Sequence, residues 1–332
     1  MIPGRAIWGL LLLLVGGALW AEEGHRIRLG FLVKQPEESW FQKEWDFAEQ
    51  ASRDLKFDLV KIAATDGGQV LTAIDNLGAQ KAEGFVICAP DVRLGPAIVA
   101  RAQAWGMKVF AVDDQLLNSD GTPLRSVPYL GISAREIGME VAAVCWAELL
   151  RRRWDLSETG AIAISFNELE TARARLAGAT TLLDAMGLPS GNIFDAPQKT
   201  TDVEGGFNAA NVTITKYPRI KHWLVFALND ESVLGGVQAL QGRGFQAFDI
   251  IGVGINGMAI AASELRKTNA TGFFASILLD ARRHGYETIG MLNRWVREGV
   301  EPPMDTRTKG TVITRDNYVA VLTAHGLGGL LK

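Results

Sequence analysis

The amino-acid sequence predicts an α/β protein made of two similar lobes, each with a doubly wound parallel sheet. The chain has 332 residues, of which 48% are hydrophobic, and this length favours two domains over one. Apolar runs of strand length alternate with helical patterns, and a second alternating set begins near Ser133. Repeated β-α units with short connections indicate a parallel sheet that is covered by helices on both faces.

The first half of the chain contains five runs with the length and composition of buried strands. They occupy residues 27–33, 57–63, 84–89, 108–112 and 127–132. Helical patterns lie between them at about 40–55, 69–81 and 92–106, and Ser39 is placed to cap the first of these helices. A loop rich in turn-forming residues at 118–123 separates the fourth strand from the fifth.

The second half repeats the same order. Helices are expected at 134–152, 169–186, 203–217, 230–242, 257–267 and 281–298, and strands at 161–166, 192–196, 222–228, 249–255 and 271–279. From Glu301 to Asn317 the pattern indicates a loop and an extended segment. Two similar α/β lobes favour a cleft between them, and domain interfaces are preferred places for small-molecule sites.

The N-terminus predicts export. Arg5 is the one charged residue among the first 21, and it is followed by a long apolar stretch that ends at Ala21. This order is typical of a cleavable signal peptide at residues 1–21, and the stretch is shorter than the roughly 20 apolar residues that a membrane-spanning helix prefers. An uncleaved anchor is the alternative, because Trp20 makes the cleavage site imperfect.

Net charge and cysteine content narrow the partners and the compartment. The formal net charge of −3 argues against nucleic acid and anionic membrane surfaces as partners. Cys88 and Cys145 have neither CxxC nor metal-ligand spacing, and we expect both to be free and buried. An exported chain without a disulfide framework fits the bacterial periplasm. The four histidines are scattered along the chain and predict no metal site.

Candidate binding residues follow the first predicted strand. Lys34 and Glu38 come directly after it, and Trp40 and Phe41 open the next helix. In open α/β sheets, ligands bind at the carboxyl ends of the strands. A cation, a carboxylate and an indole together suit a polyhydroxylated ring, because charged groups bind its hydroxyls and an aromatic face packs on its C–H face.

Other polar residues occupy corresponding places in both halves. They are Cys88, Asp113 and Asp114 in the first half, and residues 167–175, Asn229, Asp230 and Asn256 in the second. The alternative for Asp230 and Asn256 is a helix N-cap, a position that Asp and Asn favour. Together, however, these side chains supply both donors and acceptors. A sugar needs both, because each hydroxyl donates one hydrogen bond and accepts two.

Eight segments are more specific, because they follow one another in the order and spacing of a known family. They are residues 29–38, 84–88, 112–115, 167–169, 171–173, 221–224, 229–230 and 254–257. Over nearly the whole mature chain the sequence resembles the pentose- and hexose-binding family of periplasmic ABC-transporter receptors. The resemblance implies a type I periplasmic-binding fold, in which a three-segment hinge joins an N-terminal lobe (22–132 and 279–309) to a C-terminal lobe (133–278 and 310–332).

The resemblance also implies a function. The chain would be a monomeric, non-enzymatic receptor without a cofactor, which binds a monosaccharide in the cleft and delivers it to a membrane ABC permease. L-Arabinose is the expected ligand, with D-galactose or D-fucose as alternatives.

The resemblance further assigns roles to single residues. Those expected to hydrogen-bond the sugar are Lys34, Glu38, Asp114, Arg175, Asn229 and Asn256. Trp40 and Phe41 would contact its apolar patches. Those expected to line or support the site are Cys88, Asp113, Leu169 and Thr171.

Three positions depart from the family pattern. Ile132 and Leu228 stand where the family has methionines, and Ala259 stands where it has an aspartate. Ile132 would lie near the exocyclic substituent of the sugar. These changes leave open the ranking of L-arabinose, D-galactose and D-fucose, which differ at that substituent.

Parts of the sequence also fit other functions. Residues 252–257 fit the dinucleotide pattern G-x-G-x-x-G, but they would follow a late strand and not the first. Asp113 and Asp114 with Glu38 resemble a glycosidase pair, although adjacent aspartates at a strand end point in different directions. A sugar-responsive transcription regulator would carry a helix-turn-helix segment where this chain has its apolar stretch. A receptor for chemotaxis, or for another aldose such as D-xylose or D-ribose, fits the same pattern.

Overall fold

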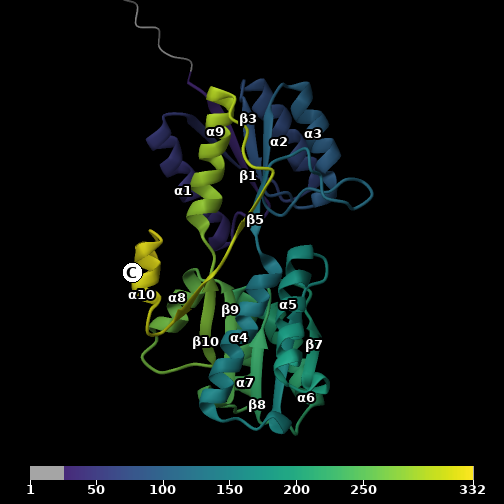
Figure 1. Cartoon of the computed structure of the whole chain (residues 1–332), viewed down its shortest axis with the longest axis vertical. Helices are drawn as coiled ribbons and strands as arrows, with labels where there is room; N and C mark the ends of the chain where they lie inside the picture. Colours follow the sequence, from purple (N-terminus) through teal and green to yellow (C-terminus); the bar gives the residue numbers. More distant parts are fainter. Residues whose placement is uncertain (1–25, 332) are drawn as a thin grey trace, which may run out of the picture.

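The computed structural model of the chain describes residues 26–331 and contains two α/β lobes, one above the other in Figure 1. Each lobe holds a six-stranded sheet, so the predicted class with two parallel-sheet lobes is confirmed. The expected signal peptide at residues 1–21 lies outside the described residues. Within residues 26–331, no helix combines the length and the apolar character needed to cross a membrane.

The first sheet is parallel throughout, in the order β11-β5-β4-β3-β1-β2. Its strands are β1 (Arg28–Val33), β2 (Asp58–Ala63), β3 (Gly84–Ile87), β4 (Lys108–Asp113), β5 (Tyr129–Ile132) and β11 (Asp305–Thr308). The helices α1 (Ser39–Leu55), α2 (Gly67–Ala79), α3 (Gly95–Ala104) and α9 (Thr288–Glu298) cover it. Neighbouring residues of β1 point to opposite faces, so Phe31 joins one buried cluster with Phe47, and Leu32 joins another with Ile74. Because both faces are buried, the strands appear in the sequence as continuous apolar runs.

The second sheet has the order β12-β10-β9-β8-β6-β7, in which β12 pairs antiparallel with β10 and the other pairs are parallel. Its strands are β6 (Thr159–Ser165), β7 (Ile193–Pro197), β8 (His222–Phe226), β9 (Ile250–Asn256), β10 (Phe273–Leu278) and β12 (Thr311–Thr314). The accompanying helices are α4 (Ala134–Arg152), α5 (Glu170–Met186), α6 (Val203–Lys216), α7 (Asp230–Gly242), α8 (Ala259–Arg266) and α10 (Tyr318–Ala324). Here α4 packs on α5, and α6 packs on α7.

The chain passes between the two sheets three times. The crossovers run from β5 to α4, from β10 to α9, and from β11 to β12. Figure 1 shows the last of these as a yellow segment that leaves the upper lobe and enters the lower one. The predicted lobe boundaries at 132/133, 278/279 and 309/310 stay a prediction.

Most predicted elements are present, and the differences concern one helix start, one π-helical turn and one short helix. Ser39 is the first residue of α1 and not its N-cap, so that prediction is wrong: Glu38 holds the cap position in extended conformation. The helix expected at 281–298 contains a π-helical turn, Arg283–Glu287, before α9. The sequence did not indicate α10, because seven residues are too few to show a helical period.

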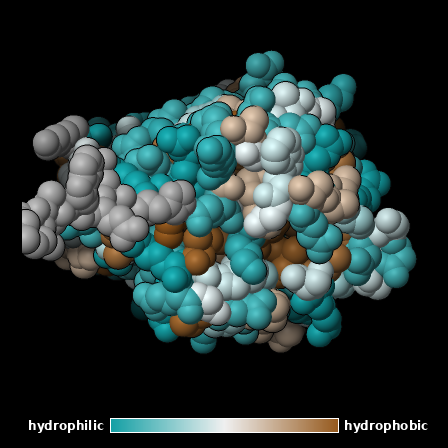
Figure 2. All heavy atoms as spheres, turned by 90° about the horizontal axis from the view of Figure 1, so that it is seen from above, coloured by the Kyte–Doolittle hydropathy of each residue, from teal (hydrophilic) through white to brown (hydrophobic). Residues whose placement is uncertain are grey.

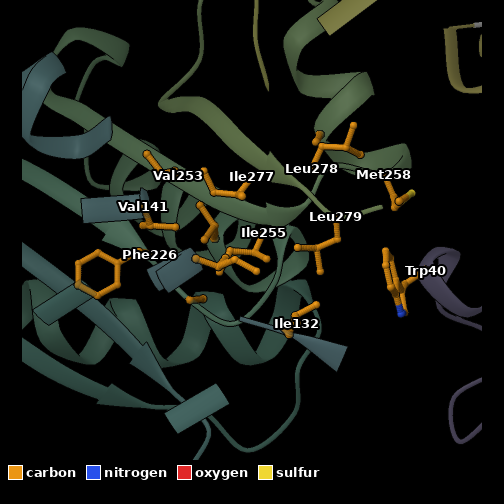
Figure 3. Close-up of a cluster of buried hydrophobic side chains, with 14 of the residues drawn as sticks. Trp40, Ile132, Val141, Phe226, Val253, Ile255, Met258, Ile277, Leu278 and Leu279 are labelled. Atoms are coloured by element: carbon orange, nitrogen blue, oxygen red, sulfur yellow. The ribbon is translucent and has the colours of Figure 1, made fainter. Parts of the chain in front are cut away.

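The apolar core extends from the second sheet to the base of the first lobe (Figure 3). Ile255 of β9 lies in the centre of the view, and Ile132 and Leu279 lie at the end that is nearest to Trp40. Trp40 belongs to α1 of the first lobe, so one buried cluster spans both lobes. The two cysteines are free and buried, as predicted. The face seen from above is mainly hydrophilic, with separate apolar patches (Figure 2).

Helices α4 and α5 are in backbone contact. A Cβ atom at Gly138 would overlap the carbonyl oxygen of Arg175, and one at Gly178 would overlap the carbonyl oxygen of Arg135. Such close approach of two backbones needs a residue without a side chain at both places. The contact at Gly138 therefore sets the position of Arg175, a predicted binding residue.

We predict that Gly138→Ala lowers the free energy of unfolding by about 1–3 kcal/mol, because the added methyl group pushes α4 away from α5. Chemical denaturation measures the change. Gly242→Ala at the end of α7 is the control, since a Cβ atom there has no heavy atom within 4 Å. Equal stability of the two variants would contradict the proposed role of the close contact.

Candidate functional site

The cleft between the lobes leads to an inner cavity. The cleft has a volume of about 1380 Å³ and the inner cavity one of about 70 Å³. The inner cavity is lined by Lys34, Gln35, Glu38, Trp40, Phe41, Asp113, Asp114, Ile132, Leu169, Thr171, Arg175, Thr201, Leu228, Asn229, Asn256 and Leu279. Many of these residues lie at strand ends or in the first turn of a helix, where parallel β-α units place their binding groups.

The structure brings the predicted binding residues together. All of them line the inner cavity except Cys88, which is buried behind Asp114 with its Sγ 3.7 Å from a carboxylate oxygen. Gln35, Thr201 and Leu279 also line the cavity but were not predicted. Gln35 and Leu279 lie just beyond strand ends, a signal that could have identified them. Thr201 lies in a loop before α6 and has no such signal.

Lys34 and Asp114 form a buried ion pair on the wall made by the first lobe. Lys34 Nζ lies 2.5 Å from Asp114 Oδ2, and the side chains are 10% and 11% exposed. Burial lowers the pKa of Lys34, but the charge and hydrogen bond of Asp114, with the charge of Asp113, raise it above its ordinary value. Thr171 of α5 donates a hydrogen bond to Asp114 Oδ1 (3.1 Å). Asp114 is therefore held from both lobes.

Asp113 binds a different set of partners from Asp114, as expected for adjacent residues at a strand end. Its φ of 62° lies in the left-handed region. Its carboxylate accepts a hydrogen bond from Trp40 Nε1 (3.3 Å) and lies 2.7 Å from His284 Nδ1. Burial raises the pKa of Asp113, but the hydrogen bond and charge of His284 bring it below its ordinary value. The backbone carbonyl accepts from the Tyr129 hydroxyl at 2.6 Å.

Trp40 and Phe41 supply an aromatic wall at the start of α1. They are 6% and 3% exposed, and both line the inner cavity. The indole N–H bonds to Asp113, and the ring meets His284 edge to face with centroids 5.2 Å apart. These two contacts fix the orientation of the indole.

The aliphatic wall contains two of the positions that depart from the family pattern. Ile132 and Leu228 are buried and line the inner cavity, together with Leu169. Ala259, the third such position, is the first residue of α8 and does not line this cavity. Any effect of these three changes on ligand choice is therefore expected first at Ile132 and Leu228.

Arg175 supplies a positive charge from the second lobe. Its Nη1 donates to the carbonyl of Leu228, while its buried Nε has no hydrogen-bond partner among the described residues. Burial lowers the pKa of Arg175, although Asp114 and other nearby carboxylates raise it. Because an arginine stays ionised in proteins, its Nε–H is available to a ligand oxygen.

Two asparagines complete the second wall. Asn229 caps α7: its Oδ1 accepts from the Ser232 N–H (3.0 Å) and its Nδ2 donates to the Thr201 carbonyl (2.7 Å). One N–H of Asn229 is left for a ligand. Asn256 ends β9 with a φ of 110°, a backbone region that asparagine enters more readily than most residues.

The N-cap interpretation of Asp230 and Asn256 is wrong for both. Asn229 caps α7, so Asp230 is its first residue, and Met258 holds the cap position of α8. The buried Asp230 carboxylate accepts hydrogen bonds from the Ser276 hydroxyl (2.6 Å) and from the backbone of the turn after β9 (2.8 Å). It thereby ties α7 to the turn that positions Asn256.

Glu38 lies where the inner cavity opens into the wider cleft, since it lines both. Burial, followed by the negative charge of Glu231, raises its pKa from 4.5 to about 7, and Lys34 opposes the rise. Glu231 lies on α7 of the other lobe and also lines the cleft. Two carboxyl groups of opposite lobes therefore repel each other when both are ionised.

A family described as periplasmic binding proteins and the sugar-binding domain of the LacI family matches residues 26–320. The chain belongs to this family of periplasmic binding proteins. An L-arabinose-binding periplasmic protein of Escherichia coli (strain K12) is 49% identical over 304 residues, 91% of this chain and 92% of the relative. An ABC transporter L-arabinose-binding periplasmic protein of Azospirillum brasilense is also 49% identical, over 91% of this chain and 90% of the relative. The predicted resemblance is confirmed.

Solved structures of sugar-binding members share the fold. A periplasmic ribose ABC transporter protein from Conexibacter woesei superposes with a TM-score of 0.74 at 18% identity, over 90% of this chain and 95% of its own. An arabinose-binding protein from Geobacillus stearothermophilus superposes with a TM-score of 0.69 at 16% identity, over 89% and 99%. At such identities the likeness concerns the fold, and the roles of single residues in ligand binding stay a prediction.

We predict that Glu38 destabilises the folded protein increasingly as the pH rises from about 4.5 to about 7. Its raised pKa means that the folded protein binds this proton more tightly than the unfolded chain does. Its contribution to the free energy of unfolding is therefore full below pH 4.5 and is lost as the pH rises through about 7. In Glu38→Gln the free energy of unfolding, measured by urea denaturation at several pH values, should fall less over this range.

The control for this measurement is Glu301→Gln, because Glu301 is exposed and is not one of the charges that raise the pKa of Glu38. It should keep the wild-type dependence on pH. An identical pH slope in wild type and Glu38→Gln would show that Glu38 titrates alike in the folded and unfolded protein.

Proposed function

We propose that the chain is a periplasmic receptor that binds one aldopyranose, L-arabinose, in the inner cavity and delivers it to a membrane ABC permease. The observation that supports this most is the buried Lys34–Asp114 pair, which shares one cavity with Arg175 and an aromatic wall. The chain is a binding protein and not an enzyme, like the transport proteins to which it is related. D-Galactose and D-fucose are the alternative ligands.

The chemistry of the cavity suits a sugar. Asp114 and Glu38 supply acceptors, Lys34 and Arg175 supply donors, and the two asparagines can do both. Hydrogen bonds with one ionised partner are shorter and roughly twice as strong as neutral ones. The indole of Trp40 offers an apolar surface to the C–H groups of the ring. Pairing Lys34 with Asp114 also offsets the cost of burying these charges when a ligand excludes water.

Sugar binding and closure of the cleft are expected to be one event. The two walls belong to different sheets, and the chain crosses between the sheets three times. A ligand that contacts both walls favours the closed form by the difference between its affinities for the closed and open forms. The hydrogen bond from Thr171 to Asp114 already joins the walls beside the cavity.

The relatives and the N-terminus support the proposed compartment and partners. Both curated relatives are periplasmic proteins. The predicted signal peptide at residues 1–21 would export this chain to the same compartment, where we expect a monomer. Presentation of the bound sugar to a chemotaxis receptor is compatible with the same site.

Calorimetric titration with L-arabinose, D-galactose, D-fucose, D-xylose and D-ribose tests the proposal. We expect saturable binding of L-arabinose at one site per chain. The affinities for D-galactose and D-fucose report how Ile132 and Leu228 accommodate an exocyclic substituent. A folded protein that binds none of the five sugars would refute the function.

We predict that Arg175→Ala weakens sugar binding by about 2–5 kcal/mol, because the variant removes a buried, charged hydrogen-bond donor that lines the cavity near Asp114. The same titration measures the loss. Arg151→Ala on α4 is the control, since the Arg151 side chain is 70% exposed and outside the cavity. Unchanged affinity in Arg175→Ala would mean that this residue does not bind the sugar.

A further inference from the structure

Glu44 is a buried carboxyl group for which the binding site described above has no role. It lies on α1, four residues after Trp40, and is 0% exposed. As an ionised group it has no hydrogen-bond donor to either carboxylate oxygen among the described residues. One of these oxygens, one oxygen of Asp113 and a ring nitrogen of His284 lie within 4.8 Å of one another. An unpaired buried charge is costly, so the proton and the partner of Glu44 must be accounted for.

His284 is already hydrogen-bonded to Asp113 and to Thr308. The Thr308 hydroxyl lies 2.8 Å from His284 Nε2 and 3.2 Å from the carbonyl of Gly131. His284 Nδ1 lies 2.7 Å from Asp113 Oδ1. A contact this short with an ionised carboxylate requires a proton on Nδ1. His284 therefore donates a hydrogen bond from Nδ1 to Asp113.

His284 Nδ1 also lies 3.7 Å from Glu44 Oε1, which is beyond hydrogen-bond distance, so its proton is not donated to Glu44. Lys34, a positive charge near Glu44, is paired with Asp114. Burial, followed by the negative charge of Asp113, raises the pKa of Glu44 well above its ordinary value. Two ionised carboxylates cannot hydrogen-bond to each other, because both only accept. A proton on Glu44 turns its contact with Asp113 into a hydrogen bond.

We propose that protonated Glu44 is a positioning residue for the sugar site, which donates a hydrogen bond to Asp113 and so holds the carboxylate that orients Trp40. Asp113 then accepts from Glu44, His284 and Trp40 together. Glutamate, aspartate and histidine also bind divalent metals, but here the proton on His284 Nδ1 lies where a metal would need a lone pair. In its effect on affinity, the inference rests on the proposed sugar-binding function.

The same hydrogen bonds connect the site with the crossovers. Gly131 lies in β5 just before the first crossover, His284 lies in the second just before α9, and Thr308 ends β11 before the third. A series of side-chain contacts, Glu44–Asp113–His284–Thr308, thus connects the helix that carries Trp40 with all three connections between the lobes. A fixed Asp113 holds the indole and these connections in one arrangement.

Two substitutions at Glu44 distinguish the effect of its hydrogen-bond donor from the effect of its side-chain size. Glu44→Gln keeps a neutral donor of similar shape, whereas Glu44→Leu keeps the size and removes the donor. Glu49→Gln is the matched control on the same helix, because Glu49 is 40% exposed and is paired with Lys61. Infrared spectra, sugar titrations and the ¹⁵N signal of the Trp40 indole, assigned with Trp40→Phe, are recorded for each protein.

We expect the wild-type minus Glu44→Gln infrared spectrum to contain the C=O stretch of a protonated carboxylic acid, and the wild-type minus Glu49→Gln spectrum to lack it. Glu44→Gln should keep the Trp40 signal and an affinity within about threefold of wild type. Glu44→Leu should shift that signal and weaken sugar binding by about tenfold or more.

Absence of the carboxylic acid band for Glu44→Gln would overturn the proposal, even if Glu44→Leu does not fold. An affinity of Glu44→Gln as low as that of Glu44→Leu, or a Trp40 signal that is the same in every variant, would overturn it too. If the wild-type protein binds no sugar, the proposed function fails. The infrared and Trp40 measurements still decide the role of Glu44 in that case.

Discussion

The buried ion pair between Lys34 and Asp114 is the constraint on which the rest of the site depends. Two charges that are about one tenth exposed stay ionised only if the groups around them are matched in charge and hydrogen bonding. Thr171 and Cys88 donate hydrogen bonds to Asp114, and Arg175 adds a positive charge from the other lobe. The pair, held by these groups, offers a fixed polar surface to a ligand, and preorganisation of this kind lowers the cost of binding.

The two adjacent aspartates have different roles: Asp114 faces the ligand cavity, and Asp113 holds the side chains around it. Asp114 faces the cavity with Lys34, whereas Asp113 takes a left-handed backbone conformation and bonds to Trp40 and His284. The first arrangement suits sugar hydroxyls, and the second fixes the aromatic wall. A single strand end therefore orients both the polar and the apolar side of the cavity, which explains why a cavity of about 70 Å³ can supply so many kinds of contact.

Much of this site could be predicted because its residues follow buried strands: Lys34, Asp114 and Asn256 each come at or just after an apolar run. Capping preferences predicted the helix starts less well. Asn229 and Asp230 are equally good N-caps, and only the packed structure shows that Asn229 caps α7. Glu44 and His284 could not be found. A carboxylate within an amphipathic helix normally faces solvent, and His284 is 171 residues from Asp113 in the chain. Strand β12 lies in the segment that was expected to be extended, but four residues were too few to predict its place at the edge of the second sheet.

The most direct measurement of the central claim is a crystal structure of the protein with L-arabinose. We expect one sugar in the inner cavity, with hydroxyl groups within hydrogen-bond distance of Lys34, Asp114 and Arg175 and with its C–H face against Trp40. We also expect Lys34 Nζ to stay within hydrogen-bond distance of Asp114 Oδ2. A sugar bound instead in the outer cleft, away from this pair, would contradict the proposed site.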